Sequence, residues 1–158
     1  MFLEKSKKLV KQQEIPSGHN PNNYIVERIE YKSHDGRLVP LTITRHKKTK
    51  IDGSANLLLY GYGSYGNSIS PSFSSTKLSL LDRNIIWATA HIRGGMEKGM
   101  KWWKEGKLTN KKNTFEDYIY AAKYLIEKKY TSKDFKKFDR VLEETALALQ
   151  SKKVINIT

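Results

Sequence analysis

The most explicit chemical pattern in the chain is Gly-Tyr-Gly-Ser-Tyr-Gly at residues 61–66, which directly follows an apolar run. Glycines with this spacing after a strand bind the pyrophosphate of a dinucleotide when a helix begins among them. Here the segment Asn67–Ser75, interrupted by Pro71, separates the glycines from the next predicted helix. Asp82 precedes the second apolar strand, whereas the fingerprint needs an acidic residue at that strand's end. We therefore expect no nucleotide cofactor.

Nucleophilic and metal-dependent catalysis are the next classes to consider. An α/β-hydrolase presents its serine in a G-x-S-x-G turn, and no serine here has glycine two positions away on both sides. Gly106 is the last glycine, so no such turn follows the main predicted helix. The chain has no cysteine, which excludes disulfides and a thiol nucleophile. We expect no metal site, because the four histidines lack ligand spacing: His19, His34, His46 and His91.

The composition fits one globular domain with a strongly basic surface. The 158 residues are 38% hydrophobic and carry 29 Lys and Arg against 16 Asp and Glu, a net charge of +13. The basic pairs are spread along the chain, whereas nucleic-acid binders concentrate charge on one element among exposed aromatics. We predict a solvated basic surface and no specific nucleic-acid partner. No apolar run approaches the roughly 18 residues of a membrane span, so we expect a cytoplasmic protein with no membrane partner.

The first predicted elements form a β-hairpin. Tyr24–Tyr31 is rich in β-forming residues, and His34 to Gly36 contains the Asp-Gly pair typical of hairpin turns. Arg37–Thr44 is the predicted return strand. Pro40 lacks an N–H group, which favours a position at the edge of the sheet.

The following elements predict an α/β arrangement. Asn56–Tyr60 and Asn84–Ile92 are apolar runs typical of strands buried on both faces, with a short helix predicted at Ser74–Arg83 between them. We expect these two strands to be parallel neighbours, with the hairpin antiparallel beside them. Trp102 and Trp103 are expected to cover an edge of the core.

The main predicted helix begins at Thr114. Thr114 is the predicted N-cap, and Asp117 stands at the reciprocal position of a capping box. A second, short helix is predicted at 141–150. One apolar stripe of the main helix is expected to face the core: Phe115, Tyr118, Ile119, Ala122, Leu125 and Ile126.

Three stretches, LLLYGYGSYGNSISPSF, AHIRGGMEKG and WWKEGKLTNKKNTFEDY, resemble the prolyl oligopeptidase family of serine peptidases, and most of all its oligopeptidase B (protease II) branch. The resemblance runs from about Leu9 to Ser132. It implies a partial α/β-hydrolase fold, truncated before the nucleophile turn. The predicted organisation is an entry segment at 1–23, the hydrolase part at 24–132 and a divergent Lys-rich tail at 133–158.

The resemblance implies a serine endopeptidase that cleaves short peptides after Lys or Arg. In the family, the tyrosine of the Gly-Tyr-Gly turn donates its hydroxyl to the oxyanion hole, and the matching residue is Tyr62. The family's Arg-Gly-Gly-Gly is Arg93-Gly94-Gly95-Met96 here, so we expect Met96 at a position of positive φ.

The resemblance also implies that the nucleophile, acid and base follow Ser132, where this sequence diverges. We therefore expect the chain to be inactive alone and to act on oligopeptides only when a complementing chain supplies the triad. The alternative is a non-catalytic interaction module whose basic surface binds an acidic partner.

Overall fold

The computed structural model describes residues 10–11, 15, 18–70 and 72–132. The tail at 133–158, including the short helix predicted at 141–150, lies outside the described residues. The elements in chain order are the 3₁₀ turn Pro21–Asn23, β1 (Tyr24–Lys32), β2 (Leu38–His46), β3 (Leu57–Tyr60), α1 (Ser75–Leu81), β4 (Ile86–Ala90), α2 (Met100–Lys104), the 3₁₀ turn Leu108–Asn110 and α3 (Lys112–Glu127).

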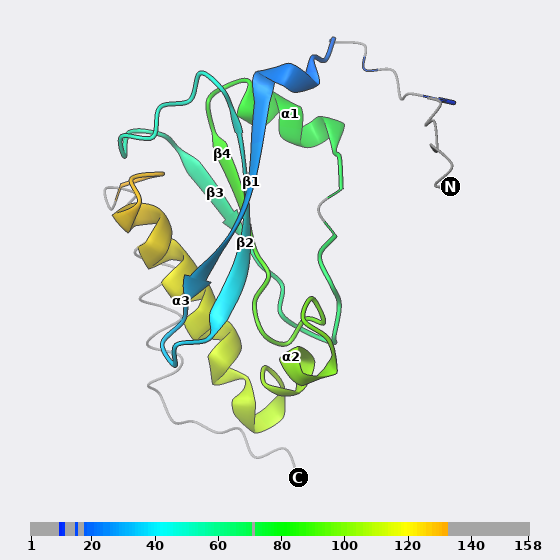
Figure 1. Ribbon diagram of the computed structural model, residues 1–158, viewed down its shortest axis with the longest axis vertical. Coiled ribbons are helices and arrows are strands. Elements are labelled where there is room, and N and C mark those ends of the chain that lie inside the picture. Colours follow the sequence, from blue (N-terminus) through cyan, green and yellow to red (C-terminus); the bar gives the residue numbers. More distant parts are fainter. Residues whose placement is uncertain (1–9, 12–14, 16–17, 71, 133–158) are drawn as a thin grey trace, which may run out of the picture.

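The described strands form one mixed sheet in the order β1-β2-β4-β3. The predicted hairpin is confirmed, because β1 and β2 pair antiparallel from Tyr24 opposite His46 to Lys32 opposite Leu38. β2 pairs antiparallel with β4, and β3 pairs parallel with β4. Helix α1 connects the two parallel strands, as predicted, and α3 runs across the sheet (Figure 1). The α/β class is therefore confirmed.

The core lies between α3 and one face of the sheet. Alternate residues of the central strands point to this face, because successive side chains of a strand leave on opposite sides. Ala121, Ala122 and Leu125 of α3 are buried against them. The fully buried strand residues are Tyr31 in β1, Val39, Leu41 and Ile43 in β2, and Ile86, Ala88 and Ala90 in β4.

Strand β3 differs from its prediction. Leu59 is buried, but Leu58 and Tyr60 are exposed, so the strand is not buried on both faces. The reason is its position at the end of the described sheet, with β4 on one side only. An apolar run thus predicted the strand correctly and its burial wrongly.

The prediction of an edge position for Pro40 is also wrong, because β2 lies between β1 and β4. The Pro40 carbonyl accepts a hydrogen bond from the His91 N–H at 2.9 Å. Paired antiparallel residues normally exchange two such bonds, and proline has no N–H to return. The indole Nε1 of Trp102 donates to the His91 carbonyl instead, at 3.0 Å. Trp102 was predicted to cover an edge of the core; it is buried within the core cluster, and its indole N–H also provides the donor that Pro40 lacks.

The predicted capping of the main helix is wrong as well. Helix α3 begins at Lys112, so Thr114 lies inside its first turn, and its hydroxyl lies 2.7 Å from the Arg93 carbonyl. Asp117 binds Arg93 rather than the helix terminus. The buried face is therefore rotated from the predicted stripe and leaves Phe115 exposed; it consists of Thr114, Asp117, Ala121, Ala122 and Leu125.

Candidate active site

The glycine-rich turn lies at the carboxyl end of β3, beside the end of its parallel neighbour β4. Ligand crevices of α/β sheets lie at this end of the strands. Tyr62 is 43% exposed there, and its hydroxyl has no hydrogen bond to any residue in the described part of the chain. A candidate donor thus lies exposed at this end of the strands.

The residues on either side of Tyr62 leave little room for its backbone to move. A Cβ atom added to Gly61 would lie 3.1 Å from Cδ2 of Tyr118 and 3.2 Å from Cδ1 of Ile92. Gly63 has φ +59°, and a Cβ there would lie 2.5 Å from Cγ2 of Thr114. Gly63 requires glycine for both its close packing and its positive φ, whereas a side chain at Gly61 would need its neighbours to shift by a few tenths of an ångström.

The loop that follows β4 packs directly against this turn. The N–H of Gly66 donates to the Gly94 carbonyl at 3.0 Å, and a side chain on Gly94 would overlap the Gly63 carbonyl. Gly94 has φ +97°. Met96 is not at positive φ, so that prediction is wrong. The position of positive φ in this loop is Gly94, and Met96, two residues later, has an ordinary negative φ.

Lys111 holds the glycine-rich turn from the other side. Its Nζ donates to the Gly63 carbonyl at 2.6 Å and lies 2.8 Å from Oγ of Ser64. Partial burial lowers the pKa of the Lys111 ammonium. This residue immediately precedes α3, so the helix and the turn are joined through one side chain.

A buried ionic cluster anchors the loop after β4. The Arg93 guanidinium binds Asp117 in a bidentate manner, with Nε and Nη2 at 2.9 and 2.7 Å from the carboxylate oxygens. Its Nη1 lies 2.6 Å from Asp35 in the hairpin turn, and Ser33 donates to Asp117. Burial opposes the charge of Arg93, but the two carboxylates outweigh it and raise the pKa of the guanidinium. The cluster joins the hairpin, β4 and α3 below the turn.

Glu97 fixes a further loop close to the site. Its Oε1 accepts the N–H of Ile69 at 3.0 Å and lies 3.8 Å from Nδ1 of His91, whose Nε2 is 2.8 Å from the Thr42 hydroxyl. Burial alone would raise the pKa of the Glu97 carboxyl. The contacts with His91 and Ile69 outweigh burial and hold that pKa below its ordinary value.

The lowered pKa of Glu97 predicts a contribution to acid sensitivity. A carboxyl with a depressed folded-state pKa stabilises the fold above its unfolded pKa, and this stabilisation is lost as the pH falls through the folded value. We expect the urea midpoint of the native chain to fall more steeply below about pH 4.5 than that of Glu97→Gln. Parallel slopes in urea titrations of the two proteins would contradict this assignment.

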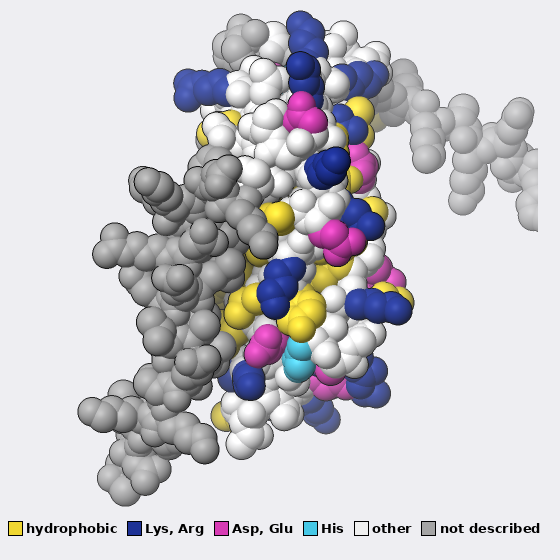
Figure 2. All heavy atoms as spheres, turned by 90° about the vertical axis from the view of Figure 1, so that its left-hand side faces the viewer, with side chains coloured by type: hydrophobic (Ala, Val, Ile, Leu, Met, Phe, Trp, Pro, Cys, Tyr) yellow, Lys and Arg dark blue, Asp and Glu magenta, His cyan; other side chains and the backbone are white. Residues whose placement is uncertain are grey.

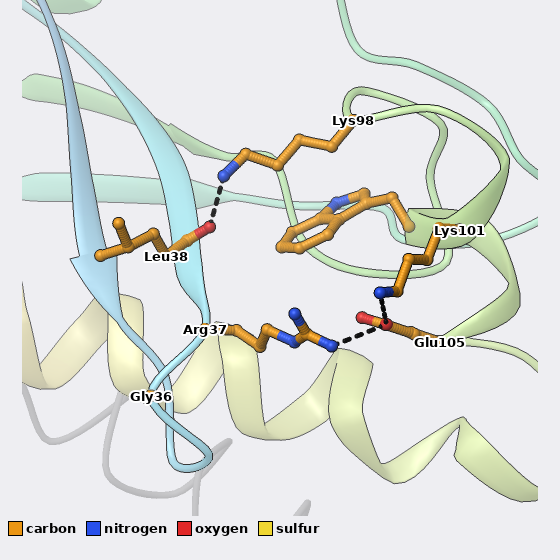
Figure 3. A pocket seen from close by; sticks show the side chains of 7 residues that line it. Gly36, Arg37, Leu38, Lys98, Lys101 and Glu105 are labelled. Atoms are coloured by element: carbon orange, nitrogen blue, oxygen red, sulfur yellow. Dashed lines mark hydrogen bonds and ion pairs between the residues drawn. The ribbon is translucent and has the colours of Figure 1, made fainter.

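Two cavities lie near these loops, and they differ in charge. The one of about 390 Å³ is lined by Arg37, Lys98, Lys101 and Glu105. Figure 3 shows that Arg37 and Lys101 both point to Glu105, at 2.9 and 3.8 Å, while Lys98 reaches the Leu38 carbonyl. Its charges are therefore largely satisfied within the chain.

The second cavity, of about 410 Å³, lies against the glycine-rich turn. Ser64, Tyr65 and Lys111 line it together with Trp103 and Lys107. It opens beside the Ser64 and Tyr65 end of the turn, and Tyr62 is not among its lining residues. Among the described residues, no three acidic or histidine side chains gather as metal ligands, and no described helix is long and apolar enough to cross a membrane.

Comparison with known proteins identifies this arrangement. The model of the prolyl oligopeptidase family matches residues 71–135. The chain is 46% identical to dipeptidyl aminopeptidase BI of Pseudoxanthomonas mexicana over 126 residues. This alignment covers 79% of this chain and 17% of the relative. Protease 2 of Moraxella lacunata is 40% identical over 75% of this chain and 17% of its own length. The chain belongs to the prolyl oligopeptidase family.

Structural comparison agrees with the sequence match. Oligopeptidase B from Leishmania major superposes with a TM-score of 0.75 at 42% identity, covering 81% of this chain and 18% of that structure. The chain therefore has the fold of a part of these peptidases, and it spans about 17% of the length of the curated relatives it matches. The predicted family and partial hydrolase fold are confirmed.

Sequence reasoning selected Tyr62 as the candidate residue but did not select the residues that hold its turn. Lys111, Glu97 and the Arg93–Asp117 pair were not predicted as site residues. Lys111 stands 48 residues from Gly63, and Arg93 stands 24 residues from Asp117. No local pattern links such distant residues. The only local signal was that Thr114 and Asp117 place polar side chains near the start of the predicted main helix.

Proposed function

We propose that this chain forms the first part of the catalytic domain of a serine endopeptidase and supplies Tyr62 to its oxyanion hole. The observation that carries the proposal is the placement of Tyr62, which is half-exposed at the carboxyl end of β3 and flanked by two tightly packed glycines. An O–H group on a restrained backbone, with no hydrogen-bond partner among the described residues, is suited to donate to a substrate oxygen that gains negative charge.

The proposed chemistry is acyl transfer. When a serine oxygen attacks the peptide carbonyl, the carbonyl oxygen gains negative charge, and donors aimed at that position stabilise the transition state. The Tyr62 hydroxyl would be one such donor. No G-x-S-x-G turn occurs within the 158 residues, so the serine, its base and its acid come from the remaining part of the domain.

The outer edge of β3 is the proposed place where that remaining part joins. β3 ends the described sheet, and its Leu58 and Tyr60 are exposed. A parallel strand added at this edge would pair with the outer backbone groups of β3, which no described strand pairs with. It would also end beside Tyr62. The added strand belongs either to the same polypeptide or to a complementing chain, and we call the product the assembled peptidase.

For the substrate we propose short peptides cleaved after Lys or Arg. The support is the similarity to oligopeptidase B and Protease 2. A module that binds an acidic partner has less support, because Lys and Arg side chains alternate with Asp and Glu on the face shown in Figure 2.

The first test is purification through an affinity tag on this chain. We expect peptidase activity to co-purify in the assembled form, with Arg and Lys substrates cleaved faster than a matched Pro substrate. A serine-directed phosphonate should label a serine outside the 158 residues, and the isolated chain should show neither labelling nor turnover. Labelling of a serine within this chain would overturn the proposal, and faster cleavage after Pro would overturn the proposed substrate preference.

A further inference from the structure

Lys111 is an unusual cation in this chain. It is partly buried, and none of the ion pairs among the described residues includes it. Its Nζ is bound instead by the Gly63 carbonyl and by Oγ of Ser64. Burial disfavours an ammonium without a carboxylate partner, and the lowered pKa of Lys111 reflects that cost.

The neighbouring lysine shows the ordinary alternative. The Lys112 side chain is 69% exposed and lies 3.9 Å from Glu116, one turn along α3. Such exposed pairs contribute little to stability. The two adjacent lysines therefore differ in their contacts. Lys112 faces solvent, whereas Lys111 donates hydrogen bonds to the turn that carries Tyr62.

The contact adds a side-chain partner to a carbonyl of the glycine-rich turn. Gly63 follows Tyr62, and packing against Thr114 and Ile92 already restricts where its Cα can lie, but a glycine by itself sets little restriction on the orientation of its carbonyl. Its carbonyl is fixed by the 2.6 Å contact with Lys111, whose backbone is held at the start of α3. Without the ammonium, the peptide between Gly63 and Ser64 loses this partner and gains other orientations. Because this peptide lies one residue after Tyr62, its reorientation would loosen the restraint on the direction of the Tyr62 side chain.

We propose that Lys111 is a positioning residue that acts through Tyr62, aligning its hydroxyl with the oxyanion. This inference rests on the proposed function of Tyr62. It assigns to Lys111 no contact with substrate. Its effect on catalysis must therefore disappear when the Tyr62 hydroxyl is absent.

The test is a double-mutant cycle in the assembled peptidase, with Lys111→Met, Tyr62→Phe and both together. Lys111→Met keeps the length and apolar stem of lysine but removes its donors. We expect it to lower kcat by roughly ten- to hundredfold, the range that misplacement of a catalytic group produces, with KM changed less than about twofold. In the Tyr62→Phe background the same substitution should change kcat less than about twofold. The control Lys112→Met should leave kcat unchanged.

The outcomes separate the two proposals. If Tyr62→Phe lowers kcat and Lys111→Met lowers it by the same factor in both backgrounds, the positioning role is wrong while the function of Tyr62 stands. If Tyr62→Phe has no effect, the proposed function itself fails. Should Lys111→Met not fold, Ser64→Ala removes one partner of the ammonium and leaves the lysine. It should give a smaller loss of kcat that also disappears with Tyr62→Phe, and an unchanged kcat would overturn the inference.

Discussion

Tyr62→Phe is expected to lower kcat of the assembled peptidase by roughly 10²–10³-fold, the usual effect of removing one oxyanion donor. KM should change little, because the hydroxyl strengthens its bond as charge develops on the substrate oxygen. The free energy of unfolding of the chain should change by less than about 0.5 kcal/mol, since the half-exposed hydroxyl has water as its alternative partner. Steady-state kinetics and urea unfolding measure the two effects.

The matched control is Tyr65→Phe in the same turn. Tyr65 is 86% exposed, and its replacement by phenylalanine removes the same group, a phenol hydroxyl, as Tyr62→Phe. We expect both kcat and the free energy of unfolding to remain at their native values. An equal loss of kcat in the two variants would show that the turn is sensitive to any change, and the specific role of Tyr62 would be wrong.

The second large effect concerns the buried ionic cluster. Asp117→Ala leaves the Arg93 guanidinium, whose side chain is 1% exposed, with only the partly exposed Asp35 as a partner. Breaking a buried pair from one side typically costs about 3–5 kcal/mol, a large part of the stability of a small domain. We expect the variant to be largely unfolded in urea concentrations that the native chain withstands, as measured by circular dichroism.

Two comparisons test the cause of that loss. Glu116→Ala changes the neighbouring residue, which pairs only at 3.9 Å with Lys112, and should cost less than about 1 kcal/mol. Replacing both Arg93 and Asp117 with leucine or methionine removes the buried charges together, and this variant should be more stable than Asp117→Ala. A double variant less stable than the single one would contradict the assignment of the loss to an uncompensated charge.

Local patterns in the sequence were sufficient for the order and type of the described strands and of helices α1 and α3, but helix α2 (Met100–Lys104) was not predicted. A run of β-forming residues and the Asp-Gly pair predicted the hairpin, and two apolar runs around a short helix predicted the parallel pair β3 and β4. Burial was harder to predict, because it depends on neighbours that are distant in the chain. Pro40 was placed at an edge on its missing N–H, yet the indole of Trp102 provides the absent donor.

The residues of the candidate site also fall into those that a local motif predicts and those that depend on distant parts of the chain. Tyr62 stands in a contiguous motif, so a resemblance to a known family was enough to select it. The groups that hold its turn come from other elements, and their pairing depends on the packing of α3 against the loops after β3 and β4. Thr114 and Asp117 illustrate the difficulty: their spacing fits a helix cap, but their partners lie in the loop that begins at Arg93.

The central claim is that Tyr62 stabilises an oxyanion, and the most direct measurement is the inhibition constant of a peptide aldehyde built on the best substrate. The aldehyde forms a hemiacetal with the catalytic serine, and its oxygen occupies the position of the oxyanion. We predict that Tyr62→Phe weakens this inhibitor by the same roughly 10²–10³-fold factor by which it lowers kcat/KM. The corresponding peptide alcohol, which cannot form the adduct, should bind both proteins equally. An aldehyde that inhibits the two proteins equally would contradict the account.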